Sequence, residues 1–405
     1  MSSNLTTLLP KLKQRQLVQL ALLCGVQCSG TKADITEHLV GVAPARPAKP
    51  LAARDRLILS IDPGIRNLGY SVLSPAAPER TRGRRKAAPP LTAASLRYPP
   101  RVILHAWRHR DLLEEAGYDE AEEAAAAKSL SKTRAKARAR AKMAEYFNPT
   151  SLAVTADRLL RDELVLPLQP TQVLVERQRW RTHGASAILE WTLRVNTLEA
   201  MLHASMRTMR ELGRWTGDIA WVVPERVARL WEPILPPRTP RARRGSAKRS
   251  TDDDDGNEEG ETEEEGTKKK RGRPRKKTTK ADDSAAAADV MEAEFKELRR
   301  TMRSQDIKKH KMRVLQNWLL SPDKIIQPAD DETKEAIERF QDRFRPRRAR
   351  QAAKSGLPAD AKARKLDDLT DSILQGMAWL KWEENRALLL REERIPELLD
   401  SDLLD

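Results

Sequence analysis

Carboxylates at the ends of apolar segments are the residues of this sequence best placed to do chemistry. Asp62 ends the otherwise apolar segment 57–62, and Glu176 ends the segment 172–176. A buried strand gains nothing from an isolated charge, because an unpaired carboxylate is costly to remove from water. Both residues are therefore candidates for a site in which a cation offsets their charge.

A third group of carboxylates lies near the C-terminus, in the segment 365–371. Spacings of three and four residues put Asp367, Asp368 and Asp371 on nearly one face of a helix. Like charges on one face are unfavourable unless cations offset them. Each carboxylate alone could instead mark a surface or cap a helix, but the three elements together favour a functional site.

Such a set of carboxylates suits metal-dependent phosphodiester hydrolysis. Mg²⁺ prefers hard oxygen ligands in near-octahedral geometry. Two ions can position an attacking water and neutralise the charge that develops on the phosphate and on the leaving oxygen. We therefore expect two Mg²⁺ ions per active site, with Mn²⁺ as a substitute.

The charge of the chain indicates the class of its partner. Among 405 residues, Lys and Arg outnumber Asp and Glu by 75 to 59, a net charge of +16. This excess favours a polyanion, with nucleic acid the leading candidate. No apolar run approaches the roughly 20 residues needed to cross a bilayer, so no membrane partner is expected. Cys24 and Cys28 are too few for a disulfide framework and have no neighbours that complete a zinc site.

The elements that must position the carboxylates follow an α/β pattern. Strands are predicted at 57–62, 68–73, 102–107, 172–176 and 219–223. Helices are predicted at 120–146, 149–164, 186–212, 289–320, 331–345 and 364–386. Three successive strands followed by alternating strands and helices are typical of a ribonuclease H-like mixed sheet flanked by helices.

Outside this core the sequence changes character. Residues 1–42 contain two predicted short helices, at 10–23 and 32–40. They resemble a SAP-type module, which implies binding to the DNA backbone, with Lys32 as the expected contact. A helical hairpin that binds another protein is the alternative. The remaining parts are a Pro-rich linker at 43–56, a nuclease core at 57–235 and 289–390, a disordered charged insertion at 236–288 and a C-terminal tail at 391–405.

Two insertions are rich in basic residues. Residues 75–100, rich in Pro and Arg, are predicted to be an extended surface insertion. Residues 236–288 contain blocks of like charge, which favour disorder. Around Arg271 and Arg273 the second insertion resembles an AT-hook, which would bind the DNA minor groove. A nuclear localisation signal and a solubilising charge run are equal alternatives.

The motifs around the carboxylates resemble those of the fungal mitochondrial Holliday junction resolvases and, more distantly, of bacterial RuvC. Segment 60–69, Ser-Ile-Asp-Pro-Gly-Ile-Arg-Asn-Leu-Gly, resembles the first motif. Segments 175–178 and 365–371 resemble the second and third. An Asp-Pro-Gly turn alone is a weak signal, whereas three motifs in this order are specific.

This resemblance implies a homodimer that binds four-way junction DNA, takes no small-molecule substrate and nicks two symmetry-related strands. Asp62, Glu176 and Asp371 map onto the catalytic metal ligands of the family. The fourth ligand is open between Asp367 and Asp368, with Asp367 preferred. The predicted helix at 186–212 would be the dimer helix, although its apolar stripe alone is explained as well by core packing.

Basic and polar side chains beside the motifs are the expected DNA contacts. Lys308, Lys309 and Lys311 resemble the basic segment that flanks the site in these enzymes, and we expect them to position phosphates, with a solvated helix face as the alternative. Gln178, at the end of the second motif, joins Lys32, Arg271 and Arg273 in this predicted set.

The predicted function is therefore the resolution of four-way junctions in recombination and repair of mitochondrial DNA. A nuclease acting on RNA–DNA hybrids or flaps would share the same carboxylates. An architectural DNA-binding protein would share the charge but has no need of the carboxylate set. The resemblance implies a location in the mitochondrial matrix. The segment before Asp34 contains no acidic residues, which is compatible with mitochondrial import. The basic run 268–277 would permit a nuclear location instead.

Overall fold

The computed structural model describes residues 3–43, 56–77, 92–115, 145–178, 190–231, 304–342 and 366–399, and single positions at 117, 131, 133, 134, 138, 344 and 404. The charged insertion with Arg271 and Arg273, most of the linker and most of the predicted helix at 120–146 lie outside the described residues. Within the described part of the chain, none of the helices is long and apolar enough for a membrane span.

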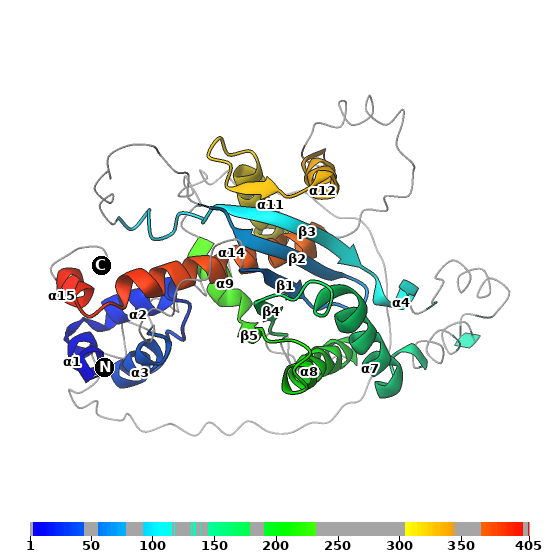
Figure 1. The fold of residues 1–405 in the computed structure, drawn as a ribbon, viewed down its shortest axis with the longest axis horizontal. Helices are drawn as coiled ribbons and strands as arrows, with labels where there is room; N and C mark the ends of the chain where they lie inside the picture. Colours follow the sequence, from blue (N-terminus) through cyan, green and yellow to red (C-terminus); the bar gives the residue numbers. More distant parts are fainter. Residues whose placement is uncertain are drawn as a thin grey trace, which may run out of the picture.

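A six-stranded mixed sheet with the order β5-β4-β1-β2-β3-β6 forms the centre of the molecule (Figure 1). An antiparallel meander comprises β1 (Ile58–Asp62), β2 (Leu68–Pro75) and β3 (Val102–Arg110). The sheet continues parallel to β1 with β4 (Gln172–Glu176) and β5 (Asp218–Val222), and β6 (Ile326–Pro328) adds to β3 at the other edge. The predicted mixed sheet flanked by helices is confirmed, whereas β6 is too short to show a strand pattern and was not predicted.

Helices cover both faces of the sheet, because successive strand residues point to opposite sides. Leu59 and Ile61 of β1 join the apolar cluster beneath one set of helices, and Ile58 joins the cluster on the other side. The first set comprises α7 (Pro149–Arg158), the π-helical turn Leu159–Leu164 and α8 (Glu190–Glu211). The opposite face is covered by α9 (Pro224–Trp231), α11 (Ser304–Leu319), α12 (Asp331–Asp342) and α14 (Leu366–Leu389).

The N-terminal helices pack on the far end of α14, which extends beyond the sheet to reach them (Figure 1). They are α1 (Ser3–Leu8), the 3₁₀ turn Leu9–Lys11, α2 (Gln14–Leu23) and α3 (Lys32–Val42), so both predicted helices are present and α1 is an addition. Their leucines belong to the same apolar cluster as Met377 and Trp382 of α14. Buried Asn385 also donates to the carbonyl oxygens of Leu23 (2.8 Å) and Leu96 (3.0 Å).

Two expectations for the surface need correction. Residues 92–98 form turns, and Leu96 is buried, so this part of the predicted extended insertion at 75–100 belongs to the core. Residues 391–405, expected to be a tail, include α15 (Arg394–Leu399) with Ile395 and Leu398 buried. In both cases one or two apolar side chains are covered by α14 and its neighbours, a long-range contact that local composition does not reveal. The short helix α4 (Leu112–Glu115) follows β3.

Candidate metal centre

Two strand ends and one helix bring three of the predicted carboxylates together. Because β1 and β4 are adjacent and parallel, their last residues, Asp62 and Glu176, lie at the same edge of the sheet. The alternation of side chains along a strand turns both toward the face that α14 covers. Asp371, in the second turn of α14, completes the group, and one carboxylate oxygen from each residue lies within 4.8 Å of the other two. Three hard oxygen donors this close together could hold a divalent ion.

Hydrogen bonds attach the first turns of α14 to the sheet. Trp107 of β3 donates its indole N–H to the carbonyl oxygen of Leu369 at 2.9 Å. Gln375 is buried and donates its side-chain amide to Ser60 Oγ at 3.1 Å and to the Ile61 carbonyl oxygen at 3.3 Å. These contacts lie on either side of Asp371 in the sequence and hold its helical turn against the end of β1.

Gly69 allows the helix to approach this closely. It is the partner of Asp62 across the β1–β2 pair, and a Cβ atom at this position would lie 2.6 Å from the backbone carbonyl oxygen of Asp368. A contact that short requires the backbone to move. Glycine at position 69 of the first motif is therefore explained by the packing of α14 over β2.

We expect Gly69→Ala to reduce cleavage by about 10- to 100-fold, because displacement of a catalytic group by about 1 Å is enough for such a loss. The fold should survive, since the clash is local. The matched control is Gly376→Ala, whose Cβ would meet the end of the buried Leu73 side chain at 2.5 Å and no backbone atom, so its effect on cleavage should be smaller. Cleavage rates and Mn²⁺ affinity of both variants test this; equal rates for Gly69→Ala and wild type would contradict it.

Burial and neighbouring charges shift the pKa values of Asp62, Asp371 and Lys311. Burial raises the pKa of Asp62 well above its ordinary value, and the negative charges of Glu176 and Asp371 raise it further. Burial also raises the pKa of Asp371, although Lys311 opposes the shift. The pKa of Lys311 is itself raised, because the attraction of the carboxylates outweighs the effect of burial, which lowers it. Concentrated negative charge of this kind is typical of a cation site.

The two candidates for the fourth ligand have different partners. Neither Asp367 nor Asp368 belongs to the close group of oxygens. Asp367 forms an ion pair with Lys308, and its charge raises the pKa of Asp371. The charge of Asp368 raises the pKa of Asp62. Each candidate therefore acts on one member of the close group, and the choice between Asp367, preferred from the sequence, and Asp368 stays open.

The predicted DNA contacts are distributed over several parts of the molecule. Lys308, Lys309 and Lys311 lie on α11, which packs on α14 beside the carboxylates. Lys309 is exposed. Lys32 belongs to the N-terminal helices and donates to the carbonyl oxygen of Pro10 at 3.0 Å. The backbone N–H of Gln178 donates to Glu199 Oε2 at 3.1 Å.

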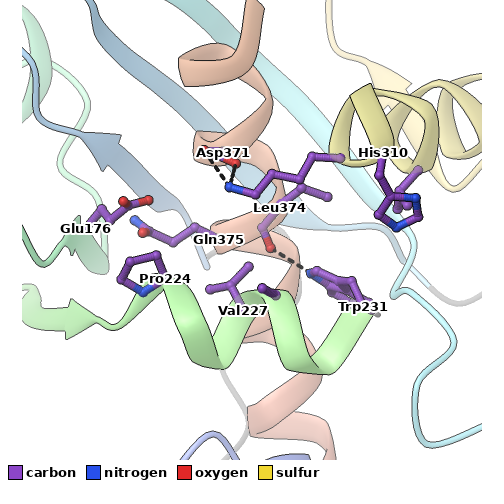
Figure 2. Close-up of a pocket in the computed structure, with 11 residues that line it drawn as sticks. Glu176, Pro224, Val227, Trp231, His310, Asp371, Leu374 and Gln375 are labelled. Atoms are coloured by element: carbon purple, nitrogen blue, oxygen red, sulfur yellow. Dashed lines mark hydrogen bonds and ion pairs between the residues drawn. The ribbon is translucent and has the colours of Figure 1, made fainter. Parts of the chain in front are cut away.

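An apolar recess opens beside the carboxylates, with about 520 Å³ of space including its open mouth. Glu176 and Asp371 line it together with Pro224, Val227 and Trp231 of α9 and with Leu374 and Gln375 of α14 (Figure 2). Sequence reasoning missed α9. Its signals were a proline at the first helical position and apolar residues three and four positions apart at Val227, Leu230 and Trp231.

Comparisons with known proteins give a consistent family. The protein-family model described as "Mitochondrial resolvase Ydc2 / RNA splicing MRS1" matches residues 58–389. The match includes all three carboxylates and begins after the N-terminal helices. "Cruciform cutting endonuclease 1, mitochondrial" of Schizosaccharomyces pombe is 29% identical over 188 residues, which cover 46% of this chain and 53% of that protein. The match thus spans about half the length of that curated relative.

Two solved structures are also similar. The crystal structure of the yeast mitochondrial Holliday junction resolvase Ydc2 superposes with a TM-score of 0.44 and 17% identity, over 93% of this chain and 95% of that one. The RuvC structure of Thermus thermophilus has a TM-score of 0.20 and 15% identity, over 46% of this chain and 85% of that one.

Proposed function

Since the chain belongs to the family described as mitochondrial resolvase Ydc2 / RNA splicing MRS1, we propose that it is an endonuclease that cleaves four-way DNA junctions by metal-dependent hydrolysis. The observation that carries the proposal is the convergence of Asp62, Glu176 and Asp371 at one end of the sheet. A protein that only binds nucleic acid, whether in RNA splicing or in DNA packaging, would not need three mutually repelling carboxylates held this close.

Each residue of the site has a distinct role in this proposal. Asp62, Glu176 and Asp371 hold the divalent ions, with Asp367 or Asp368 as the fourth ligand. Two bound Mg²⁺ ions would supply the activation of water and the stabilisation of the leaving oxygen. Gln375 and Gly69 keep α14 against β1 and β2, and the exposed Lys309 contacts a DNA phosphate beside the site.

Paired nicking requires two such sites, so the proposal includes a homodimer. Large apolar side chains remain exposed on α8 and on the adjacent edge strand: Trp191 is 41% exposed, Leu193 51% and Trp221 60%. Exposed apolar patches of this kind often mark protein interfaces, which supports the assignment of α8 as the dimer helix. The proposed location is the mitochondrial matrix, where the DNA substrate would be mitochondrial.

The test is cleavage of end-labelled substrates by the purified full chain. Four-way junction, linear duplex, flap and RNA–DNA hybrid are incubated with and without Mg²⁺, at enough salt to suppress nonspecific binding. We expect symmetric paired nicks in the junction alone, and only with the metal. Cleavage mainly of hybrid or flap would replace junction resolution by another nuclease activity, and binding without cleavage of any substrate would refute the catalytic proposal.

A further inference from the structure

Two lysines of α11 face two aspartates of α14. Lys308 pairs with Asp367, and Lys311 pairs with Asp371. The lysines are three residues apart and the aspartates four, which is about one helical turn in each helix. The two ion pairs therefore connect consecutive turns of the helices beside the carboxylates.

The two pairs differ in their surroundings. The Lys308 side chain is 51% exposed and that of Lys311 is 25% exposed, whereas both aspartates are largely buried, with Asp367 14% and Asp371 19% exposed. The Nζ atom of Lys311 lies 2.7 Å from Asp371 Oδ1 and 2.8 Å from Oδ2. Lys311 also lines the recess that Glu176 borders. Its ammonium thus engages both oxygens of one proposed metal ligand.

The charges of the other two carboxylates act on the same ammonium. Glu176 and Asp62 both raise the pKa of Lys311, in addition to Asp371. One positive charge is therefore shared by the whole group of proposed metal ligands. A cation that approaches these oxygens meets the repulsion of the ammonium and must compete for Asp371.

We propose that Lys311 is the internal counterion of the metal-free site, that a divalent ion displaces it from Asp371, and that the released ammonium then binds the DNA phosphate next to the metal. The lysine stem is long and flexible enough for such a movement, and its head is a compact point charge. Lys311 is thus a positioning residue that makes metal loading favour substrate binding. The phosphate step rests on the proposed function, whereas the competition with the metal does not.

The competition is tested by measuring Mn²⁺ affinity of the full chain without DNA, by titration calorimetry or electron paramagnetic resonance. Lys311→Met keeps the apolar stem and removes the charge, and we expect it to bind Mn²⁺ on the order of tenfold more tightly. Lys311→Arg keeps a charge that can pair with Asp371 and should bind Mn²⁺ no more tightly than wild type. Lys308→Met is the matched control, because Lys308 pairs with Asp367, which lies outside the close group. The charge of Lys308 also acts on Asp371, so this variant should gain some Mn²⁺ affinity, but clearly less than Lys311→Met.

The second step is tested by junction binding with Ca²⁺ in place of Mg²⁺, which separates binding from cleavage. Wild type should bind the junction more tightly when the metal is present, and Lys311→Met should lose most of this gain. Unchanged or weaker Mn²⁺ affinity of a folded Lys311→Met protein would overturn the counterion role. If this affinity rises although wild type cleaves no substrate, the competition stands and the proposed function fails.

Discussion

Asp62→Asn is expected to reduce junction cleavage by at least about 10³-fold while leaving the protein folded and able to bind the junction. Loss of a metal ligand removes several kcal/mol of transition-state stabilisation, and each factor of ten in rate corresponds to about 1.4 kcal/mol. Asparagine has nearly the same shape as aspartate, so the packing between β1 and α14 is retained. The measurements are single-turnover cleavage in Mg²⁺ and junction affinity in Ca²⁺.

The same substitution should make the metal-free protein more resistant to unfolding. The pKa of Asp62 is raised in the folded state, so the folded protein binds a proton there more tightly than the unfolded chain does. Its contribution to stability is therefore present below the unfolded pKa of about 3.9 and is lost as the pH rises through the folded pKa. At neutral pH, without metal, the neutral amide of the Asp62→Asn variant avoids this cost, and the midpoint of thermal unfolding should rise.

Asp157→Asn is the control for both measurements. Asp157 lies on α7 and forms an exposed i, i+4 ion pair with Arg161, so neither cleavage nor stability should change appreciably. Residual cleavage by Asp62→Asn above about a tenth of the wild-type rate would exclude Asp62 as a required metal ligand. Loss of junction affinity in that variant would point to a role in DNA binding instead.

Removal of residues 1–43 is expected to destabilise the nuclease core severely, although the family match begins at residue 58. The N-terminal helices share one apolar cluster with Trp382 and Leu389 of α14. Each large apolar side chain that loses its cover costs about 1.5–3 kcal/mol, against a typical total stability of about 5–15 kcal/mol. The truncated chain should therefore be insoluble or readily proteolysed. If it melts like wild type and still cleaves junctions, the N-terminal helices are an independent module.

A point substitution tests the same contact without removing any helix. Gly25 follows α2 with φ +67°, and a Cβ atom there would lie 2.2 Å from the indole of Trp382. Gly25→Ala combines strain at positive φ with a clash in the core, and we expect a loss of roughly 2–4 kcal/mol in the free energy of unfolding.

Gly41→Ala in α3 provides the comparison. A Cβ atom at Gly41 meets no atom within 4 Å, so the substitution should be neutral or stabilise α3 by up to about 1 kcal/mol. Denaturant unfolding of both variants gives the two values. A Gly25→Ala protein as stable as Gly41→Ala would show that the N-terminal helices do not depend on the close contact with α14.

Local sequence patterns were sufficient for the elements that carry the site. The apolar runs that end at Asp62 and Glu176 predicted β1 and β4, because a strand buried on both faces is recognisable from its composition. The spacing of Asp367, Asp368 and Asp371 predicted the start of α14, because residues three and four positions apart share one face of a helix. By contrast, β6 and α9 are short, and tertiary packing determines most of their stability.

The sequence by itself determined which carboxylates could bind a metal ion and in which order they occur along the chain. Only the tertiary structure decided how they meet. The crossing of α14 over Gly69 brings the first turn of this helix next to the end of β1, and the packing of α11 on α14 gives Lys311 its place at Asp371. The spacing of residues along the sequence shows which of them share one face of a helix. Which side chains of different helices and strands touch depends on how the whole core packs.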